Sequence, residues 1–520
     1  MTTKRIRRIP FLSFVLIAVL ALGVVAQSWV GSSVEAHLQD AETPDQITIA
    51  LASELNTLDP AFFTSSNEQS IYYAVFDTLV TRDADLNIIP GLAESWETID
   101  DNTWEFRLRD GVTFHDGSPM TAEDVKFSID RIIGDFMENP SQSKLATIQE
   151  VQVVDPLTVR IITTSPDPIL LSRLAGIVGW IVPKAHIEST GFEDFATNPV
   201  GTGPYKFVSW VKDEELVLEA NPDYWNGAPS IGRVVFRPVP EASTRLALLK
   251  SGDVDVIQDV PTDQAPALEG DENLEIIATP LLRSMYFILR SDQEGPLADV
   301  RVRQAINYAV DKEGIVNELL NGYGIVSQGQ TMGPEYFGFA DDLEPYPYDP
   351  DKARELLAEA GFADGFSIEM LTPAGRYQAD VTIAEAVAGQ LSEIGINVEI
   401  ESVDFSVYVT RKLDRTIDPI TLGAWSQAVY DADGVVYLLF HTDEPWGVHY
   451  SNPRVDELVE EARSTLDQEQ RLELYREALE IIREDAPVLF MHQQTLLSGV
   501  KTGTPVLTMP DETFIVYPKW

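Results

Sequence analysis

The chain has 520 residues, no cysteine, and 83 Asp and Glu against 37 Lys and Arg, which gives a formal net charge of -46. So acidic a chain is a poor partner for nucleic acid or an anionic membrane surface, because binding to these polyanions relies on Lys and Arg. The absence of cysteine excludes thiol catalysis, disulfides, Cys-based metal sites and a lipid anchor on cysteine. With 44% hydrophobic and 23% charged residues, the chain is expected to be globular, with several domains.

The N-terminus has the pattern of a secretory signal peptide. Basic residues at positions 4, 5, 7 and 8 precede an apolar run from Phe11 to Ala26 that only Ser13 interrupts. We predict a signal peptide over 1–26, with a second cleavage option at Ala36. Retention as an anchor is the less favoured alternative, because a spanning helix needs roughly 20 apolar residues. The mature protein is therefore expected in the periplasm, without a lipoprotein cysteine.

The first half of the chain mixes predicted strands and helices. Apolar alternation predicts strands over 47–52, 104–109, 149–154 and 157–163. One helix is predicted over 68–79, and another after Thr121, which has a capping arrangement with Asp124. The turn residues around Phe114 suggest that this segment forms a hairpin with the strand at 104–109.

Beyond residue 290, predicted helices are separated by short apolar strands. The helices are predicted over 350–360, 380–394, 454–464 and 467–485, and the strands over 366–371, 397–401 and 420–425. This alternation is typical of an open α/β lobe with helices on both faces of the sheet. A Pro- and Gly-rich segment at 198–204 marks a domain boundary in the first half.

Common catalytic motifs are missing from the sequence, with one partial exception. Ser141–Lys144 fits S-x-x-K, Tyr224–Asn226 occupies the middle position and Lys501–Gly503 gives K-T-G, the elements of a penicillin-recognising serine enzyme. Chance is the better explanation, because Ser141 is expected in a loop and the last gap is too long for one compact site. His441 and His449 could meet as metal ligands, although ordinary loop histidines are favoured. No metal or cofactor is predicted.

Three long strings carry a family resemblance. The first is Leu-Ala-Glu-Ser-Trp-Glu at 92–97, followed by Trp-x-Phe-x-Leu-Arg-Asp-Gly-Val-x-Phe-His-Asp-Gly at 104–117 and Thr-Ala-Glu-Asp-Val-Lys-Phe-Ser at 121–128. The second is Gly-Thr-Gly-Pro-Tyr at 201–205 with Asn-Pro-Asp-Tyr-Trp at 221–225, and the third runs from Pro296 to Asp311. In these strings the chain resembles the exported solute-binding proteins of ABC importers, in the oligopeptide, dipeptide and nickel receptor class (family 5).

The resemblance implies a fold of the α/β class, like that of periplasmic binding proteins. Two lobes would be joined by a hinge of two crossovers, near 280–290 and 487–495, with the ligand enclosed between them. An extra α+β subdomain would belong to the N-terminal lobe, and His115 and Asp116 would be turn and packing residues. The expected parts are lobe I at 45–80, 199–284 and 490–520, the subdomain at 81–198, and lobe II at 285–489.

The resemblance also implies a set of ligand-contacting residues. The expected contacts are Glu54, Leu55, Tyr286, Arg411, Trp425, Gln427, Tyr430, Asp431 and Phe490. One position departs from the peptide receptors, in which an aspartate pairs with the ligand's α-ammonium group: here this position is Ala428. Since a buried ammonium group without a carboxylate is costly, either Asp431, Asp433 or Glu54 replaces that aspartate, or the ligand is not an ordinary peptide.

The expected function is therefore noncatalytic. The protein would capture a small polar solute, with a peptide favoured, and deliver it as a monomer to the membrane permease subunits of an ABC importer. The alternatives are a receptor for a sugar, opine or nickel chelate and, at a distance, the penicillin-recognising serine enzyme. Nucleic acid is not an expected partner.

Overall fold

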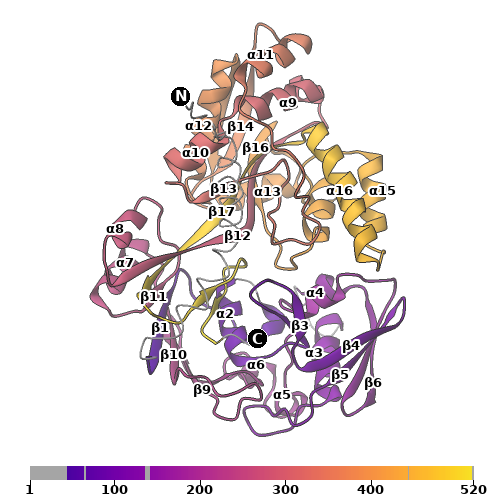
Figure 1. The fold of residues 1–520 in the computed structure, drawn as a ribbon, viewed down its shortest axis with the longest axis vertical. Helices are drawn as coiled ribbons and strands as arrows, with labels where there is room; N and C mark the ends of the chain where they lie inside the picture. The colour runs from indigo at the N-terminus through magenta and orange to yellow at the C-terminus, as the bar shows by residue number, and fades with distance from the viewer. Residues whose placement is uncertain (1–43, 64–65, 135–140, 443, 518–520) are drawn as a thin grey trace, which may run out of the picture.

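The computed structural model describes residues 44–63, 66–134, 141–442 and 444–517. The predicted signal peptide at 1–26, and its alternative end at residue 36, lie outside these residues. Two lobes are stacked along the long axis of the molecule, and the strands β12 (Leu274–Leu289) and β17 (Val488–Lys501) run between them (Figure 1). In the described part of the chain, no helix is both long enough and apolar enough to cross a membrane.

One mixed sheet of 11 strands extends through both lobes. Its order is β15-β14-β16-β12-β17-β11-β1-β10-β9-β8, and β13 (Gly324–Val326) pairs with β17 beside this path. The strands β12 and β17 pair antiparallel along almost their whole length, with a register shift between Pro280 and Ser284. The two predicted crossovers overlap this strand pair, which contributes to both lobes.

Lobe I, the lower lobe in Figure 1, is built on one half of the sheet. Its strands are β1 (Gln46–Leu51), β8 (Tyr205–Val211), β9 (Glu215–Ala220), β10 (Arg233–Pro238) and β11 (Val256–Ile257). The strand β1 lies between β10 and β11 and is parallel to both. The helices of this lobe include α2 (Ser66–Val75), α5 (Lys184–Thr190), α6 (Phe192–Phe195), α7 (Ala242–Ser251) and α8 (Ala265–Glu269).

A four-stranded antiparallel sheet adds a separate layer to lobe I. Its order is β4 (Ala93–Asp100), β5 (Thr103–Leu108), β7 (Thr158–Thr163) and β6 (Ile148–Asp155). The helix α3 (Ala122–Ile133) begins with the predicted capping box of Thr121 and Asp124 and packs on this sheet. The short elements β2 (Val80–Arg82), β3 (Ile88–Pro90) and α4 (Leu170–Leu174) complete this part.

Two local predictions in this half are wrong. The strand at 104–109 does not form a hairpin with the segment around Phe114, because β4 and β7 occupy both of its edges. The helix predicted over 68–79 ends at Val75, whose carbonyl accepts a hydrogen bond from the Gly203 amide at 2.9 Å. Because β7 and Gly203 are distant in sequence, long-range contacts override the local pattern in both cases.

Lobe II confirms the predicted alternation of helices and strands. Its parallel strands are β14 (Phe366–Pro373), β15 (Ile396–Val403) and β16 (Ile420–Trp425). One face is packed by α9 (Val300–Ala309), α10 (Lys312–Leu319), α11 (Pro350–Glu359) and α12 (Asp380–Glu393). The other face is packed by α13 (Phe405–Leu413), α14 (Leu438–Phe440), α15 (Pro453–Ala462) and α16 (Gln468–Asp485).

The alternation of side chains along β12 explains these two cores. Tyr286 and Ile288 point into the core on one face, whereas Met285, Phe287 and Leu289 point into the core on the other. Because neighbouring residues of a strand face opposite sides, a nearly continuous apolar run predicts a strand that is covered on both faces.

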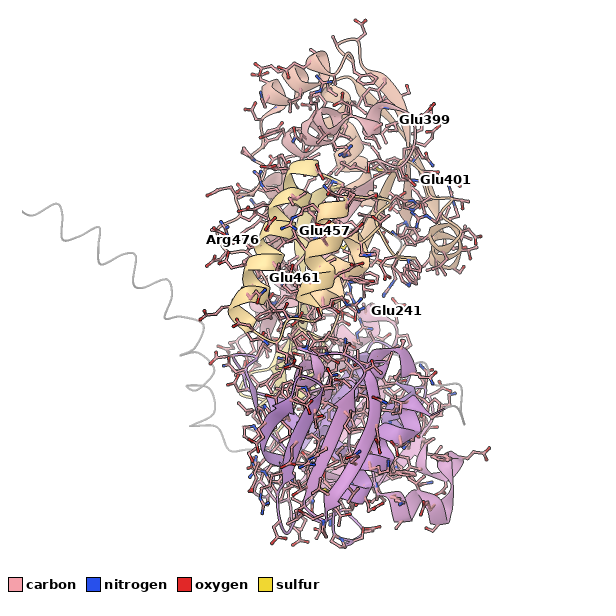
Figure 2. The ribbon with its side chains drawn as sticks, turned by 90° about the vertical axis from the view of Figure 1, so that its right-hand side faces the viewer. Glu241, Glu399, Glu401, Glu457, Glu461 and Arg476 are labelled. Carbon is pink, nitrogen blue, oxygen red and sulfur yellow. The ribbon has the colours of Figure 1, made fainter. Side chains whose placement is uncertain are left out.

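Many of the acidic residues that give the chain its charge lie on the outside of the fold. Glu399 and Glu401 project from β15, at the edge of the large sheet, and Glu457 and Glu461 from α15 (Figure 2). Charged side chains on an edge strand discourage pairing with a second chain. These four side chains therefore contribute to the negative charge of the surface.

The Gly-Thr-Gly-Pro-Tyr string has a steric role. A Cβ atom at Gly201 would lie 2.0 Å from the carbonyl oxygen of Val75, a backbone atom at the end of α2. We expect Gly201→Ala to lower the free energy of unfolding by about 1 to 3 kcal/mol, because helix and loop must move apart. Gly389→Ala is the matched control: a Cβ atom there meets no atom within 4 Å, and a better helix former should add up to about 1 kcal/mol. Urea unfolding measures both, and equal losses would contradict the steric role.

Candidate functional site

The topology brings strand ends of both lobes together. In lobe II the last residue of β16, Trp425, lies opposite Ser284 in the middle of β12. In lobe I, β11 runs toward the middle of β17. Its residue Val256 pairs with Val500, and its last residue, Ile257, pairs with Gly499. The parallel strands of each lobe therefore direct their carboxyl ends toward the other lobe, and such ends are the usual place for ligands in α/β sheets.

We use the term interlobe junction for the residues that follow these strand ends and those that face them. From lobe II it includes the segments 374–379 and 425–431, and from lobe I it includes Arg82, Asp259 and the segment 511–512, with Arg283 between the lobes on β12.

Arg82 makes a direct contact between the lobes. Its guanidinium donates to the carbonyl of Val429 at 3.1 Å and lies over the ring of Tyr430, 4.6 Å from the centroid. Ala428 and Val429 pack against the core of the four-stranded sheet. Tyr430 has a φ of 58°, a left-handed conformation that is uncommon outside glycine and that is often found at binding sites.

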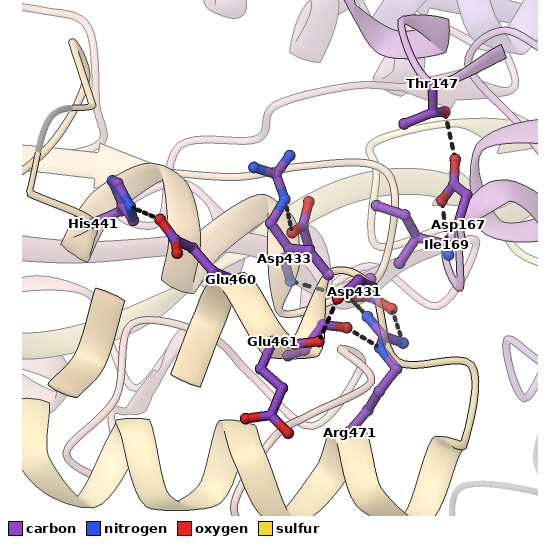
Figure 3. Close-up of polar contacts among 12 residues, drawn as sticks. Thr147, Asp167, Ile169, Asp431, Asp433, His441, Glu460, Glu461 and Arg471 are labelled. Atoms are coloured by element: carbon purple, nitrogen blue, oxygen red, sulfur yellow. Dashed lines mark hydrogen bonds and ion pairs between the residues drawn. The ribbon is translucent and has the colours of Figure 1, made fainter. Parts of the chain in front are cut away.

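Asp431 is held by a buried ion pair. Its carboxylate accepts hydrogen bonds from both terminal nitrogens of Arg471, at 2.9 and 3.1 Å (Figure 3). Asp433 pairs with Arg463 at 2.8 Å, and burial together with Asp431 raises its pKa. Glu54 accepts hydrogen bonds from the amides of Leu55 and Asp213. All three carboxylates considered as replacements for the missing aspartate are thus engaged by protein groups.

Besides Asp431, three expected contacts lie in the segment 425–431 of the junction. Trp425 is half-buried, donates its indole N–H to the carbonyl of Gly434 at 2.7 Å and lies beside Trp446 with ring centroids 6.1 Å apart. The backbone N–H of Gln427 donates to the hydroxyl of Tyr336 at 2.9 Å, and Tyr430 follows in the same segment.

The other expected contacts are engaged within the lobes. Leu55 is buried in the core of lobe I, whereas Tyr286 and Phe490 are buried in lobe II. Burial raises the pKa of Tyr286 well above its usual range. Arg411 forms ion pairs with Glu401 at 2.8 Å and Asp418 at 2.6 Å. Trp425 packs against the same core as Tyr286 and Phe490, whereas Leu55 belongs to the core of lobe I and Arg411 to its ion pairs.

Charged residues that the sequence analysis did not single out lie at the junction. Asp259 has a φ of 53°, and the positive charges of Arg245, Arg283 and Arg376 act to lower the pKa of its carboxyl group. Desolvation and the charge of Glu512 raise the pKa of Asp259, and burial raises the pKa of Asp511. Within the described residues, Arg376 has no carboxylate at ion-pair distance. The junction therefore presents charges of both signs that could meet a charged solute.

The two histidines considered as metal ligands have separate partners. His441 contacts Glu460 at 3.0 Å, and His449 contacts Asp292 at 3.1 Å. Desolvation lowers the pKa of His449 to about 4. Among the residues that the structure describes, no group of three or more His, Asp or Glu side chains could hold a metal ion.

His115 and the residues of the serine-enzyme pattern, Ser141, Lys144 and Lys501, are in packing or pairing contacts within the fold. The ring of His115 lies between the backbone of Gly201, at 3.3 Å, and that of Gly203, at 2.9 Å, as a packing residue would. Ser141 is buried ahead of the 3-10 turn Gln142–Leu145, and the ammonium group of Lys144 lies 4.4 Å from the ring centroid of Phe63. Lys501 lies at the end of β17, beside Asp255.

Comparison with known proteins gives consistent matches along the chain. Residues 87–446 match the family described as bacterial extracellular solute-binding proteins, family 5 Middle. The glutathione-binding protein GsiB of Pectobacterium atrosepticum is 30% identical over 479 residues, which cover 90% of this chain and 92% of that protein.

Solved structures have the same fold. HbpA2 from Haemophilus parasuis superimposes with a TM-score of 0.83 at 25% identity, over 91% of this chain and 99% of that chain. The periplasmic binding protein DppA from Helicobacter pylori, in complex with the peptide STSA, gives a TM-score of 0.72 at 25% identity, over 91% and 96% of the two chains. Other structures of this fold contain Ni(L-His) or agropinic acid.

Proposed function

Because this chain belongs to the family 5 extracellular solute-binding proteins, the noncatalytic binding components of ABC transporters, we propose that it captures a small charged solute at the interlobe junction. One observation carries this proposal: the carboxyl ends of strands from both lobes are directed toward each other. Trp425 is the last residue of one of these strands, and Arg376 and Asp259 follow the ends of two others. A ligand that contacts both lobes would stabilise the form in which they lie close together.

We propose that the ligand is a peptide or a related amino-acid derivative with a carboxylate. Arg376 is an exposed guanidinium without an ion-pair partner in the described chain, and such a group binds a carboxylate through two parallel hydrogen bonds. Asp259 offers the opposite charge to an ammonium group, in place of Asp431, Asp433 and Glu54. GsiB is named for glutathione and DppA contains a peptide, and both ligands carry ammonium and carboxylate groups.

We also propose a location, an oligomeric state and a partner for the protein. The protein would act as a periplasmic monomer and pass its ligand to the permease of an ABC importer. The predicted lobe boundaries, with lobe II at 285–489 and the subdomain at 81–198, are retained. An opine or a nickel chelate stays the second candidate, because related structures hold agropinic acid or Ni(L-His).

Calorimetric titration of the purified protein tests the proposal. The ligands are glutathione, Met-Leu, Ser-Thr-Ser-Ala, agropinic acid and Ni(L-His). Binding of a peptide-type ligand with a micromolar Kd, about 8 kcal/mol of free energy, is the expected result. Binding of agropinic acid or Ni(L-His) alone would favour the second candidate, and a folded protein that binds none of the five would contradict the proposal.

A further inference from the structure

The loop that carries Arg376 is fixed by a single carboxylate. Asp380, 5% exposed at the start of α12, accepts hydrogen bonds from the amides of Gly375 at 3.2 Å, Arg376 at 2.9 Å and Tyr377 at 3.0 Å. Its carboxylate also accepts a hydrogen bond from the amide of Val381 at 2.9 Å. Charge-assisted hydrogen bonds to backbone amides are stronger than neutral ones, so this loop has little freedom to rearrange.

Two aromatic rings hold the guanidinium at the end of that loop. The central carbon of the Arg376 guanidinium lies 5.1 Å from the ring centroid of Phe405 and 5.4 Å from that of Tyr377. Phe405 reaches Arg376 because β14 and β15 are parallel neighbours that end together, with Pro373 opposite Val403. Phe405 is the first residue of the helix that follows β15, and its ring also stacks on Tyr408 at 5.7 Å.

These contacts suit a binding group better than a packing group. The Arg376 guanidinium lies over two rings and has no carboxylate at ion-pair distance in the described chain, so its N–H donors remain for the carboxylate of a ligand. Phe405 is 36% exposed, which is unusual for a large aromatic side chain that serves only the core. An arginine already fixed in position loses less conformational entropy when a ligand binds.

We propose that Asp380 and Phe405 are positioning residues that hold Arg376 in place for the carboxylate of the ligand. This inference rests on the proposed function and deepens it, because it names two residues that set the preference for an acidic ligand without touching the ligand themselves. The same chemistry predicts that a ligand with an amide in place of its carboxylate gains nothing from either residue.

The test compares the free-acid and C-terminal amide forms of Met-Leu and Ser-Thr-Ser-Ala by calorimetry, since amidation leaves neither peptide with a carboxylate. Asp380→Asn is expected to weaken binding of the free acid about three- to tenfold, and Phe405→Leu about two- to fivefold, with the amide forms almost unchanged. Phe405→Tyr should restore the preference for the acid. Val407→Ala is the control on α13, because Val407 is exposed but makes none of these ring contacts.

A double-mutant cycle separates positioning from a general effect on folding. In an Arg376→Gln background, Asp380→Asn and Phe405→Leu should change the affinity for the free acid less than about twofold. Equal weakening of acid and amide forms, or full effects in the Arg376→Gln background, would overturn the inference while leaving the proposed function intact. A wild-type protein that binds none of the free acids would overturn both.

Discussion

Replacing Arg471 by methionine is expected to lower the free energy of unfolding by about 3 to 5 kcal/mol, because the buried Asp431 would lose its cation. The two side chains are only 1% and 4% exposed, and Arg471 also donates to the carbonyl of Ala462 at 3.0 Å. Urea unfolding of the purified protein measures the loss. The variant should also disturb the segment that follows Trp425, since Asp431 is part of it.

The same helix supplies a matched control. Arg476 lies on the surface (Figure 2) and forms an exposed ion pair with Asp342 at 2.6 Å. Exposed pairs contribute at most about 1 kcal/mol. Arg476→Met should therefore have a small effect. A second change, Asp431→Asn, should recover part of the stability of Arg471→Met, because it removes the uncompensated charge. Equal losses for the two arginine variants would contradict the role given to the buried pair.

Replacing Arg376 by glutamine is expected to weaken binding of a carboxylate ligand by about 10- to 100-fold, the cost of losing hydrogen bonds to a charged group. Arg376→Lys should recover only part of the affinity, because an ammonium group keeps the charge but not the planar pair of donors. Calorimetric titration with the peptide-type ligand that the wild-type protein binds gives both values.

A charge-matched control separates a direct contact at Arg376 from a long-range effect of net charge on the affinity of so acidic a protein. Arg354 lies on α11 and pairs with Asp351 at 2.6 Å on the surface. Arg354→Gln removes one positive charge, as Arg376→Gln does, and should leave the affinity within about twofold, because salt screens exposed charges that are far apart. A similar loss in both variants would mean that net charge, and not a contact at Arg376, sets the affinity.

Local structure in lobe II was predictable because each helix and strand there carries its own signals. Asp349 caps α11, with Pro350 at the first helical position, and β14 and β16 are short apolar runs between helices. In lobe I, the end of α2 at Val75 and the pairing of β5 with β7 depend on residues more than 40 positions away. Local periodicity holds no information about such pairings.

The candidate site was less predictable than the fold, for a similar reason. The aromatic residues after β16 stood out in the sequence, but the partner that engages Asp431 lies 40 positions further along the chain. Arg376 is one arginine in a short loop, with no periodic pattern to mark it. The available signal for an ordered loop was an aspartate, Asp380, five residues after Gly375 and at the start of a helix. An aspartate there can accept hydrogen bonds from the amides of the preceding turn.

A crystal structure of the protein with the ligand found by titration tests the central claim most directly. The proposal predicts ligand density between the lobes, with a carboxylate on the guanidinium of Arg376 and contacts to at least one residue of lobe I, such as Asp259. Density that contacts a single lobe, or that lies away from the ends of β11, β14 and β16, would contradict it.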